Sequence, residues 1–312
     1  MQISHLGIHE SVEAVFPPEQ LREELSALDP TVAVVGDGDR DALADCDALV
    51  TFAYRESFLD ADLEWIHSIQ AGYDRFPLSE LEEAGIILTN STGIHGTSVG
   101  ETVLGTMLEI ARRLHRFSRQ QVAHEWTRPD WDEPFTLQHE PICVVGLGTL
   151  GQGIAKRADA IGMHVTGVRR SAESVPHVRT VYANDDLHEA ISDARFVALA
   201  TPLTDETEGL MGEAEFDAMR DDAYFVNVAR GDCADQDALV AALQGGDIAG
   251  AALDVFEEEP LPEDSPLWDM DDVIVTPHAA AAEVDYYRHI AELVRENAQH
   301  IDADEELTNR VV

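Results

Sequence analysis

The sequence is poor in lysine. Its 312 residues include 61 Asp and Glu but only 20 Lys and Arg, and Lys156 is the single lysine among those twenty. The formal net charge of −41 repels nucleic acid and anionic membrane surfaces, so neither is expected as a partner. An acid-rich, lysine-poor composition resembles that of proteins from salt-accumulating halophiles, whose multimolar salt screens charges over about 3 Å.

Cysteine pairs and long apolar segments are also missing. The three cysteines, Cys46, Cys143 and Cys233, are far apart and odd in number, which argues against a disulfide framework or a zinc site. No metal is expected. No run of about 18 apolar residues predicts a membrane helix, and the start "MQISHLGIHE" lacks the features of a secretory signal. With thiols expected to stay reduced, these absences predict a cytoplasmic protein.

What is present is an alternation of strand-like and helix-like segments in two parts of the chain. In the first part, short apolar runs predict strands at 32–36, 48–52, 66–70 and 86–90, and Gly85 is expected to close the helix "LSELEEAG". The second part runs from "PICVVGLG" to "VIVTPHAAA". Strands that alternate with helices indicate an α/β fold with parallel sheets, and the length allows two domains.

Helical periodicity connects and follows these two parts. Apolar residues recur at helical spacing over 98–117 and predict one long helix there. A stretch rich in Trp, Pro and His, roughly 120–140, predicts an extended arm. The segment from Val284 to about Ala298 predicts a last helix, which is expected to return to the first domain.

A glycine motif carries the first functional signal. Gly146, Gly148 and Gly151 have the G-x-G-x-x-G spacing, after the apolar run "ICVV" and at the start of a helical pattern. This context favours a dinucleotide site, in which the glycines permit a tight turn and close approach of the backbone to pyrophosphate. The N-terminus of the helix supplies N–H groups to the phosphates.

The stretch "GMHVTGVRRS" indicates which dinucleotide is bound. An acidic residue about 20 positions after the motif binds the ribose 2′-hydroxyl of NAD, but this chain has Arg169 there, followed by Arg170 and Ser171. Arginine cannot accept the hydroxyl's hydrogen bond, and it pairs well with phosphate. The sequence therefore predicts a pocket for the 2′-phosphate of NADP, although one of the two arginines is also explained as a balance to local acid.

Three polar residues each follow a predicted strand in the second part. Arg230 follows the run 224–228, Glu259 the run 251–256 and His278 the run 273–276. Because ligands bind beyond the carboxyl ends of strands in open α/β sheets, we expect them to converge. Arg230 is suited to bind a carboxylate and polarise a keto oxygen. His278 is suited to transfer a proton, with Glu259 orienting it and favouring its charged form.

These stretches together resemble the D-2-hydroxyacid dehydrogenase family. The resemblance rests on "VVGLGTLGQGIA", "ATPLTDETEGLM", "NVARGD", "GAALDVFEEEPL" and "TPHAA", with "QAGYDRF" and "TNSTGIHGTSVGE" before them. It implies reversible reduction of 2-ketoacids to D-2-hydroxyacids by hydride transfer from NAD(P)H. The arginines of "GVRRS" resemble the NADPH-preferring glyoxylate/hydroxypyruvate reductase branch.

The resemblance also implies roles for individual residues. Arg230, Glu259 and His278 would be catalytic, and Arg230 and His278 would also contact substrate. The backbone of Ala71, Gly72 and Tyr73 would bind the substrate carboxylate, and Asp254 would contact the nicotinamide carboxamide. The expected cofactor-binding set is Gly146, Gly148, Thr149, Leu150, Gly151, Arg169, Arg170, Ser171, Thr201, Pro202, Leu203, Val228, Ala229 and Asp254.

The same resemblance implies two Rossmann-like, doubly wound domains and a homodimer. Residues 1–98 and 284–312 would form a smaller, flavodoxin-like substrate domain, and 99–283 the cofactor domain. The long helix and the arm would form the dimer interface; Trp126 or Trp131 would reach a neighbour's pocket or simply pack in the interface.

Two other functions fit the same motifs. One is a dehydrogenase of formate or phosphite with this fold; the other is a nucleotide-sensing regulator that has kept it. The substrate side chain is not determined, and Phe52, Tyr54, Tyr73 and Tyr286 are candidate pocket residues.

Overall fold

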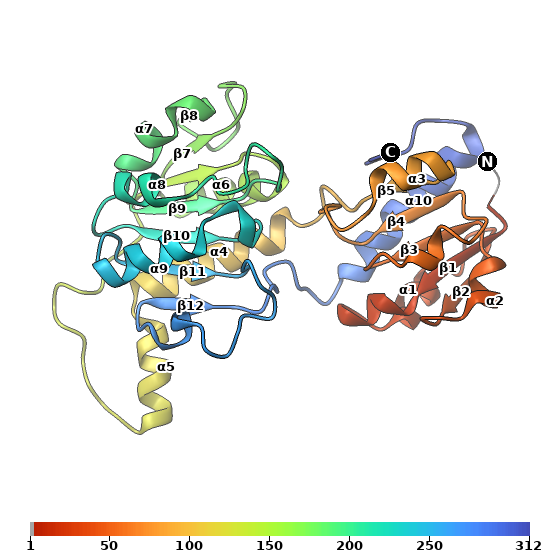
Figure 1. Cartoon of the computed structure of the whole chain (residues 1–312). Helices are drawn as coiled ribbons and strands as arrows, with labels where there is room; N and C mark the ends of the chain where they lie inside the picture. Colours follow the sequence, from red (N-terminus) through yellow and green to blue (C-terminus); the bar gives the residue numbers. More distant parts are fainter. Residues whose placement is uncertain (1–2) are drawn as a thin grey trace. The chain divides into compact units, whose positions relative to one another are not determined.

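The computed structural model describes residues 3–312 and divides the chain into two compact units. One unit is formed by the chain up to Ile94 together with Ala282–Val312, and the other by His95–Ala281. The sequence places these divisions at 98/99 and 283/284. Each unit is an α/β structure with one parallel sheet (Figure 1).

The first unit contains a five-stranded sheet in the order β2-β1-β3-β4-β5. Its strands are β1 (His5–His9), β2 (Thr31–Val35), β3 (Ala48–Thr51), β4 (Trp65–Ser68) and β5 (Ile87–Thr89). Its helices are α1 (Pro18–Leu25), α2 (Arg40–Ala44), α3 (Leu78–Ala84) and α10 (Tyr286–Ala303). Gly85 ends α3 with a left-handed φ of 74°, which confirms the expected cap.

Alternate residues of these strands enter two cores. Leu6, Ile8 and Val50 pack with α1 and α10, whereas Leu49 and Ile66 pack on the opposite face with α2 and α3. The helix predicted from 284 to about 298 is α10, and it returns to the first unit as expected. The strand β1 was not anticipated, because the motif "HLGIH" contains two histidines and a glycine. Gly7 packs closely there, since a Cβ would lie 2.8 Å from the end of the Leu49 side chain and would displace it.

The second unit contains a seven-stranded sheet in the order β12-β11-β10-β9-β6-β7-β8. The strands are β6 (Pro141–Val145), β7 (His164–Val168), β8 (Thr180–Tyr182), β9 (Phe196–Leu199), β10 (Tyr224–Asn227), β11 (Gly250–Leu253) and β12 (Val273–Val275). The helices are α4 (Gly96–Ala111), α5 (Leu114–Ala123), α6 (Thr149–Ala160), α7 (Leu187–Ser192), α8 (Glu213–Ala218) and α9 (Gln236–Gly245). Short 3-10 turns are formed by Glu10–Ala14, Glu56–Phe58, Asn184–Asp186, Gly231–Cys233 and Pro266–Asp269.

Helices cover both faces of the seven-stranded sheet. Ile142 and Val144 of β6 pack with α4 and α6, whereas Cys143 and Val145 pack on the other face with α7, α8 and α9. The unit is therefore doubly wound, and all its strands end at the same edge. Their carboxyl ends are where a ligand site is expected.

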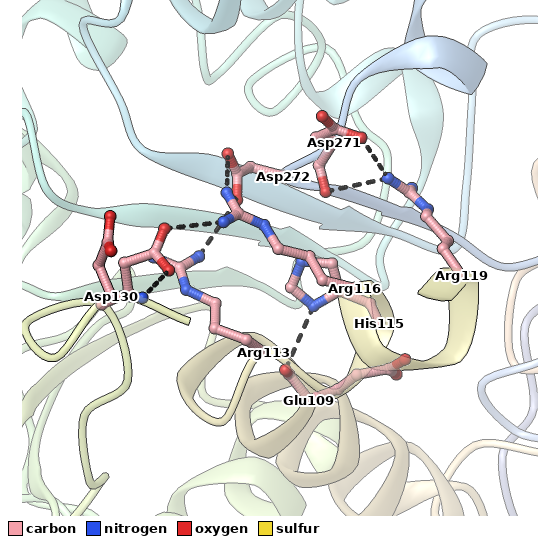
Figure 2. A network of polar contacts seen from close by, with 9 residues as sticks. Glu109, Arg113, His115, Arg116, Arg119, Asp130, Asp271 and Asp272 are labelled. Carbon is pink, nitrogen blue, oxygen red and sulfur yellow. Dashed lines mark hydrogen bonds and ion pairs between the residues drawn. The ribbon is translucent and has the colours of Figure 1, made fainter. Parts of the chain in front are cut away.

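The single long helix predicted over 98–117 is wrong. Two helices, α4 and α5, replace it, because Arg113 adopts a left-handed φ of 57°. Figure 2 shows why the chain turns there: Arg113 and Arg116 both reach the carboxylate of Asp272, at 3.1 and 2.9 Å. Arg116 also pairs with Glu133 at 2.9 Å. Leu114, expected in the apolar stripe, is consequently 48% exposed.

Candidate active site

The three motif glycines follow β6, each with a different steric role. Gly146 has a φ of 95°, and a Cβ on it would lie 2.7 Å from the Ala200 carbonyl oxygen. A Cβ on Gly151 would lie 1.8 Å from the Gly146 carbonyl oxygen. Nothing lies within 4 Å of a Cβ placed on Gly148, the N-cap of α6. The loop thus packs tightly where it faces the protein and leaves open the backbone that precedes Thr149 and Leu150, as phosphate binding requires.

Arg169, Arg170 and Ser171 lie directly after β7. The Arg169 N–H donates to the Tyr182 carbonyl oxygen at 3.1 Å, which fixes its backbone to β8. Within residues 3–312, neither Arg169 nor Arg170 forms an ion pair with a carboxylate, although the chain is crowded with acid. Ser171 Oγ donates to Glu173 Oε2 at 3.5 Å. Two unneutralised guanidinium groups at this strand end are suited to an anionic ligand.

The loop after β9 carries Thr201, Pro202 and Leu203. Its shape is fixed by Thr207, whose Oγ1 donates to the Pro202 carbonyl oxygen at 2.6 Å. The Thr204 N–H donates to the same Oγ1 at 2.8 Å. This rigid turn lies next to Gly146 at the sheet edge, because a Cβ on Gly146 would also touch Thr201 at 2.8 Å.

Glu259 and His278 meet at this same edge. His278 Nδ1 lies 2.9 Å from Glu259 Oε2, and the Phe256 N–H donates to Glu259 Oε1 at 3.3 Å. A carboxylate only accepts hydrogen bonds, so Nδ1 carries the proton in this pair. Nε2 is therefore the nitrogen that remains for a reacting group. The side chain of His278 is 43% exposed and that of Glu259 24%, so the pair is accessible to a small molecule.

Asp254 holds the loop that carries His278. Its buried carboxylate accepts from Thr276 Oγ1 at 2.6 Å and from the N–H groups of Ala279 and Ala280, both at 2.9 Å. Its carbonyl oxygen accepts the His278 N–H at 2.8 Å. His278 itself has a left-handed φ of 50°. That conformation is strained for a residue with a side chain, and the bonds around it maintain it.

Arg230 follows β10 and is positioned by Asn227, which sequence reasoning missed. Asn227 Nδ2 donates to the Arg230 carbonyl oxygen at 3.1 Å, and its Oδ1 accepts the Ala229 N–H at 3.0 Å. Val228 and Ala229 of this turn are buried. The available signal was only general: asparagine after an apolar run commonly forms a turn through its side chain.

Gly231 brings the Arg230 turn against the segment that leads to Glu259. A Cβ on Gly231 would lie 1.9 Å from the Phe256 carbonyl carbon and 2.3 Å from the Glu257 nitrogen. Only glycine permits this approach of two backbones. The turns after β10 and β11 are therefore packed directly on each other.

The predicted substrate-binding backbone of Ala71, Gly72 and Tyr73 belongs to the first unit and follows β4. Across the described chain, no acceptor lies within hydrogen-bond distance of the N–H groups of these three residues. Backbone N–H groups that form no intramolecular bond are suited to bind an anion.

The four candidate pocket residues have different surroundings. Tyr73 is 41% exposed. Tyr54 packs edge-on against Phe58, and Phe52 is partly buried against the core of its unit. Tyr286 is buried, and its hydroxyl donates to the Ile69 carbonyl oxygen at 2.5 Å. Its hydroxyl therefore supports the loop that precedes Ala71, and its place in the substrate pocket stays a prediction.

Across residues 3–312, no group of three or more His, Cys, Asp or Glu is arranged to hold a metal ion. Cys46, Cys143 and Cys233 are buried free thiols, and burial raises the pKa of Cys143 to about 12. Among the described helices, none has the length and apolar character needed to cross a membrane.

The glycine loop, the sheet edge and the His–Glu pair define a dinucleotide-binding α/β enzyme. Residues 104–280, more than half of the chain, match the model of the D-isomer specific 2-hydroxyacid dehydrogenase NAD binding domain. The chain therefore belongs to the D-isomer specific 2-hydroxyacid dehydrogenase family.

The chain is similar in sequence to two kinds of reductase. The chain is 36% identical over 219 residues to glyoxylate/hydroxypyruvate reductase B of Klebsiella pneumoniae, which covers 69% of this chain and 68% of that protein. It is 34% identical over 299 residues to glyoxylate reductase of Thermofilum pendens, with 93% and 83% covered.

Solved structures agree over nearly the whole length. A D-isomer specific 2-hydroxyacid dehydrogenase of Xanthobacter autotrophicus, in complex with NADPH and MES, is 29% identical, with a TM-score of 0.79 over 99% of this chain and 98% of that one. An NADPH-dependent glyoxylate/hydroxypyruvate reductase of Sinorhizobium meliloti, in complex with NADP and sulfate, is 26% identical, with a TM-score of 0.83 over 98% of each chain. The fold class of two Rossmann-like domains is thereby confirmed.

The close approach at Gly231 yields a stability test. Gly231→Ala forces a Cβ into the Phe256 backbone and is expected to destabilise the protein by about 1–3 kcal/mol, the usual cost of overpacking. Gly105→Ala is the matched control, because nothing lies within 4 Å of a Cβ there in the middle of α4. It is expected to stabilise by about 0.5–1 kcal/mol. Denaturant unfolding measures both, and equal stability of the two variants would contradict the packing.

Proposed function

We propose that this protein is an NADPH-dependent reductase of short 2-ketoacids such as glyoxylate and hydroxypyruvate, with D-2-hydroxyacids as products. The observation that carries the proposal is the His278–Glu259 pair at 2.9 Å, held at the same sheet edge as the glycine loop. Family membership and the reductases among the relatives support it.

The residues present fit a dinucleotide. The open backbone at Gly148 and the N-terminus of α6 would hold the pyrophosphate, and the turn at Thr201–Leu203 and the Val228–Ala229 segment would line the cofactor. The Asp254 carboxylate accepts three intramolecular hydrogen bonds. An ionised carboxylate can accept about four, so Asp254 would also accept one from the nicotinamide carboxamide. When bound, the reduced nicotinamide supplies a hydride.

Substrate binding in this proposal uses charge and backbone donors. The free N–H groups of Ala71, Gly72 and Tyr73 bind the ketoacid carboxylate, and the guanidinium of Arg230 binds the carboxylate and keto oxygens. Arg230 does not supply a proton, because a guanidinium stays charged at any working pH. Its task is to stabilise negative charge on the oxygen.

The proton comes from His278. Its Nε2–H donates to the keto oxygen as that oxygen becomes a hydroxyl, and the reverse reaction returns the proton to Nε2. Glu259 keeps the ring oriented through Nδ1 and stabilises the charged imidazole. Formate oxidation releases no proton from its substrate and a regulator transfers none, so neither of these two alternatives uses this pair. Phosphite oxidation consumes a water that must lose a proton, so the pair does not argue against phosphite. Phosphite belongs in the substrate panel as a control.

Replacing Glu259 tests the assignment of the proton donor. Glu259→Gln keeps the size of the side chain but removes the negative charge beside the imidazolium. Reductive kcat/KM, which requires the charged ring, is expected to begin falling at a lower pH than in the parent enzyme. His278→Ala is expected to lose about 10²–10⁴-fold in rate with NADPH affinity nearly unchanged. Identical pH profiles for the parent enzyme and Glu259→Gln would show that Glu259 does not assist His278.

NADPH is the proposed cofactor because Arg169 occupies the position where other enzymes of this fold have an acidic residue that binds the ribose hydroxyl. In addition, neither Arg169 nor Arg170 has a carboxylate partner within residues 3–312. Arg169→Ala removes one charge-assisted bond to the 2′-phosphate, worth roughly 1.5–3 kcal/mol. The KM for NADPH is then expected to rise about tenfold or more, while the KM for NADH is spared. Equal changes for both cofactors would refute the assignment.

We further propose that two copies of the chain form a homodimer through α5 and the segment 124–140, called the arm. We also propose that the protein works in a cytoplasm rich in salt. In Figure 1 the arm extends away from the sheet of its own unit. On the arm, Trp126 and Trp131 are 96% and 92% exposed, and Val122, near the end of α5, is 85% exposed. Arg113, Arg116 and Arg119 form ion pairs with Asp272 and Asp271, and these pairs hold α5, the helix that leads to the arm, on its own unit (Figure 2). Exposed apolar side chains on an arm suit a two-fold interface, and three free thiols suit a reducing compartment.

One KCl series tests assembly and salt dependence together. In molar KCl, light scattering is expected to give twice the 34.2 kDa chain mass, and melting is expected to rise well above its value in dilute buffer as salt screens the charge of −41. Trp126→Ser is expected to weaken the dimer, and Trp268→Ser, an exposed tryptophan outside the arm, to leave it intact. A 34.2 kDa species throughout would exclude the dimer, and a flat melting temperature would exclude adaptation to salt.

A further inference from the structure

The loop that follows β4 is held by its carbonyl oxygens. Three consecutive carbonyls each accept one hydrogen bond from a segment distant in sequence. The Tyr286 hydroxyl donates to Ile69 at 2.5 Å, the Ser91 N–H to Gln70 at 3.0 Å, and Asn90 Nδ2 to Ala71 at 2.7 Å. The start of α10 and the end of β5 thereby fix one face of the loop.

The opposite face of the loop carries its N–H groups. In a planar trans peptide the C=O and the following N–H point in opposite directions. Fixing the Gln70 and Ala71 carbonyls therefore turns the N–H groups of Ala71 and Gly72 away from Asn90 and Ser91. These are donors that find no acceptor within residues 3–312. The direction of the anion-binding donors is thus set by the residues that hold the carbonyls.

Asn90 is itself held in one orientation. It is buried, and its Oδ1 accepts the Thr92 N–H at 3.1 Å. With Oδ1 engaged, the amide group must present Nδ2 to the Ala71 carbonyl oxygen. Its backbone N–H donates to the Asn309 carbonyl oxygen at 3.1 Å. No rotation of the amide satisfies these partners in any other way.

A buried network of side-chain hydrogen bonds holds Ser91 in place. Ser91 Oγ donates to the Ser68 carbonyl oxygen at 2.9 Å and therefore accepts from His67 Nε2 at 3.1 Å. His67 Nδ1 then accepts from Thr89 Oγ1 at 2.8 Å, and Trp65 Nε1 donates to the same Oγ1 at 2.8 Å. Burial lowers the pKa of His67 to about 3, so the ring stays neutral at neutral pH and the hydrogen-bond directions do not change.

We propose that Asn90 is a positioning residue for carboxylate binding: through the Ala71 carbonyl it aims the free N–H groups of the Ala71–Tyr73 loop at the substrate carboxylate. The inference rests on the proposed function, because that function makes this loop the carboxylate site. Asn90 acts through the loop backbone, and Tyr286 assists it at Ile69.

Asn90→Asp tests the proposal with almost no change in shape. A carboxylate oxygen replaces Nδ2, removes the donor and repels the Ala71 carbonyl oxygen. The KM for glyoxylate and the Kd for oxalate, measured calorimetrically on the NADPH-loaded protein, are each expected to rise about tenfold or more. The KM for NADPH is expected to stay within twofold. A role in folding alone would lower melting without this split between substrate and cofactor.

Asn297→Asp is the matched control. Asn297 is fully buried in the same unit and bonds the Thr308 backbone through both amide atoms, at 3.1 and 2.7 Å. The substitution adds the same charge in a similarly buried place but lies within α10, and its amide bonds only the Thr308 backbone among the described residues. It is expected to lower the melting temperature and leave the glyoxylate KM unchanged.

The outcomes separate the two proposals. The role of Asn90 is overturned if the parent protein binds oxalate and Asn90→Asp binds it with the same Kd. It is also overturned if Asn297→Asp raises the Kd for oxalate as much as Asn90→Asp does. If Asn90→Asp does not fold, Tyr286→Phe removes one hydroxyl donor from the same loop and is expected to raise the Kd for oxalate several-fold; no change there also overturns it. A parent protein that neither binds oxalate nor reduces glyoxylate overturns the proposed function, and this inference with it.

Discussion

The buried carboxylate of Asp254 is the interaction on which the catalytic edge depends. Asp254 directly follows β11, and its carboxylate accepts three hydrogen bonds from the segment after β12, while its carbonyl oxygen accepts a fourth from the His278 N–H. An unpaired charge in this position would be costly, so the surrounding donors and the carboxylate require one another. The left-handed His278 and its contact with Glu259 follow from this arrangement. The residue that the family resemblance assigns to the cofactor thus also holds the segment that carries the proposed proton donor.

Close backbone approach is the second constraint on the site. Gly146, Gly151 and Gly231 each sit where a Cβ would overlap another strand end. These contacts bring turns from four neighbouring strands to one short stretch of the sheet edge. In the first unit the same precision is reached differently, since side chains and N–H groups hold a run of carbonyls. Both devices orient backbone groups through packing and hydrogen bonds.

Much of the site was predictable because its signals are local. The glycine spacing, the arginines after β7 and the placement of Glu259 and His278 after strands all depend on a few neighbouring residues. Strands with continuous apolar runs were found in the same way. The strand β1 escaped because its two histidines and glycine hide the pattern, and the long helix was divided because one arginine turns toward an aspartate far away in sequence. Periodicity cannot register such a contact.

The sequence by itself determined the fold class, the dinucleotide motif and the family, because each is written in residue order and spacing. Only the tertiary structure decided which polar groups are satisfied and which stay free. Asn227 and Asn90 look like ordinary turn residues until their partners are seen, and the hydrogen bond from the Tyr286 hydroxyl to the Ile69 carbonyl oxygen is equally invisible in the sequence. Hydrogen bonds between distant segments depend on the path of the chain in space, and short sequence windows do not contain that path.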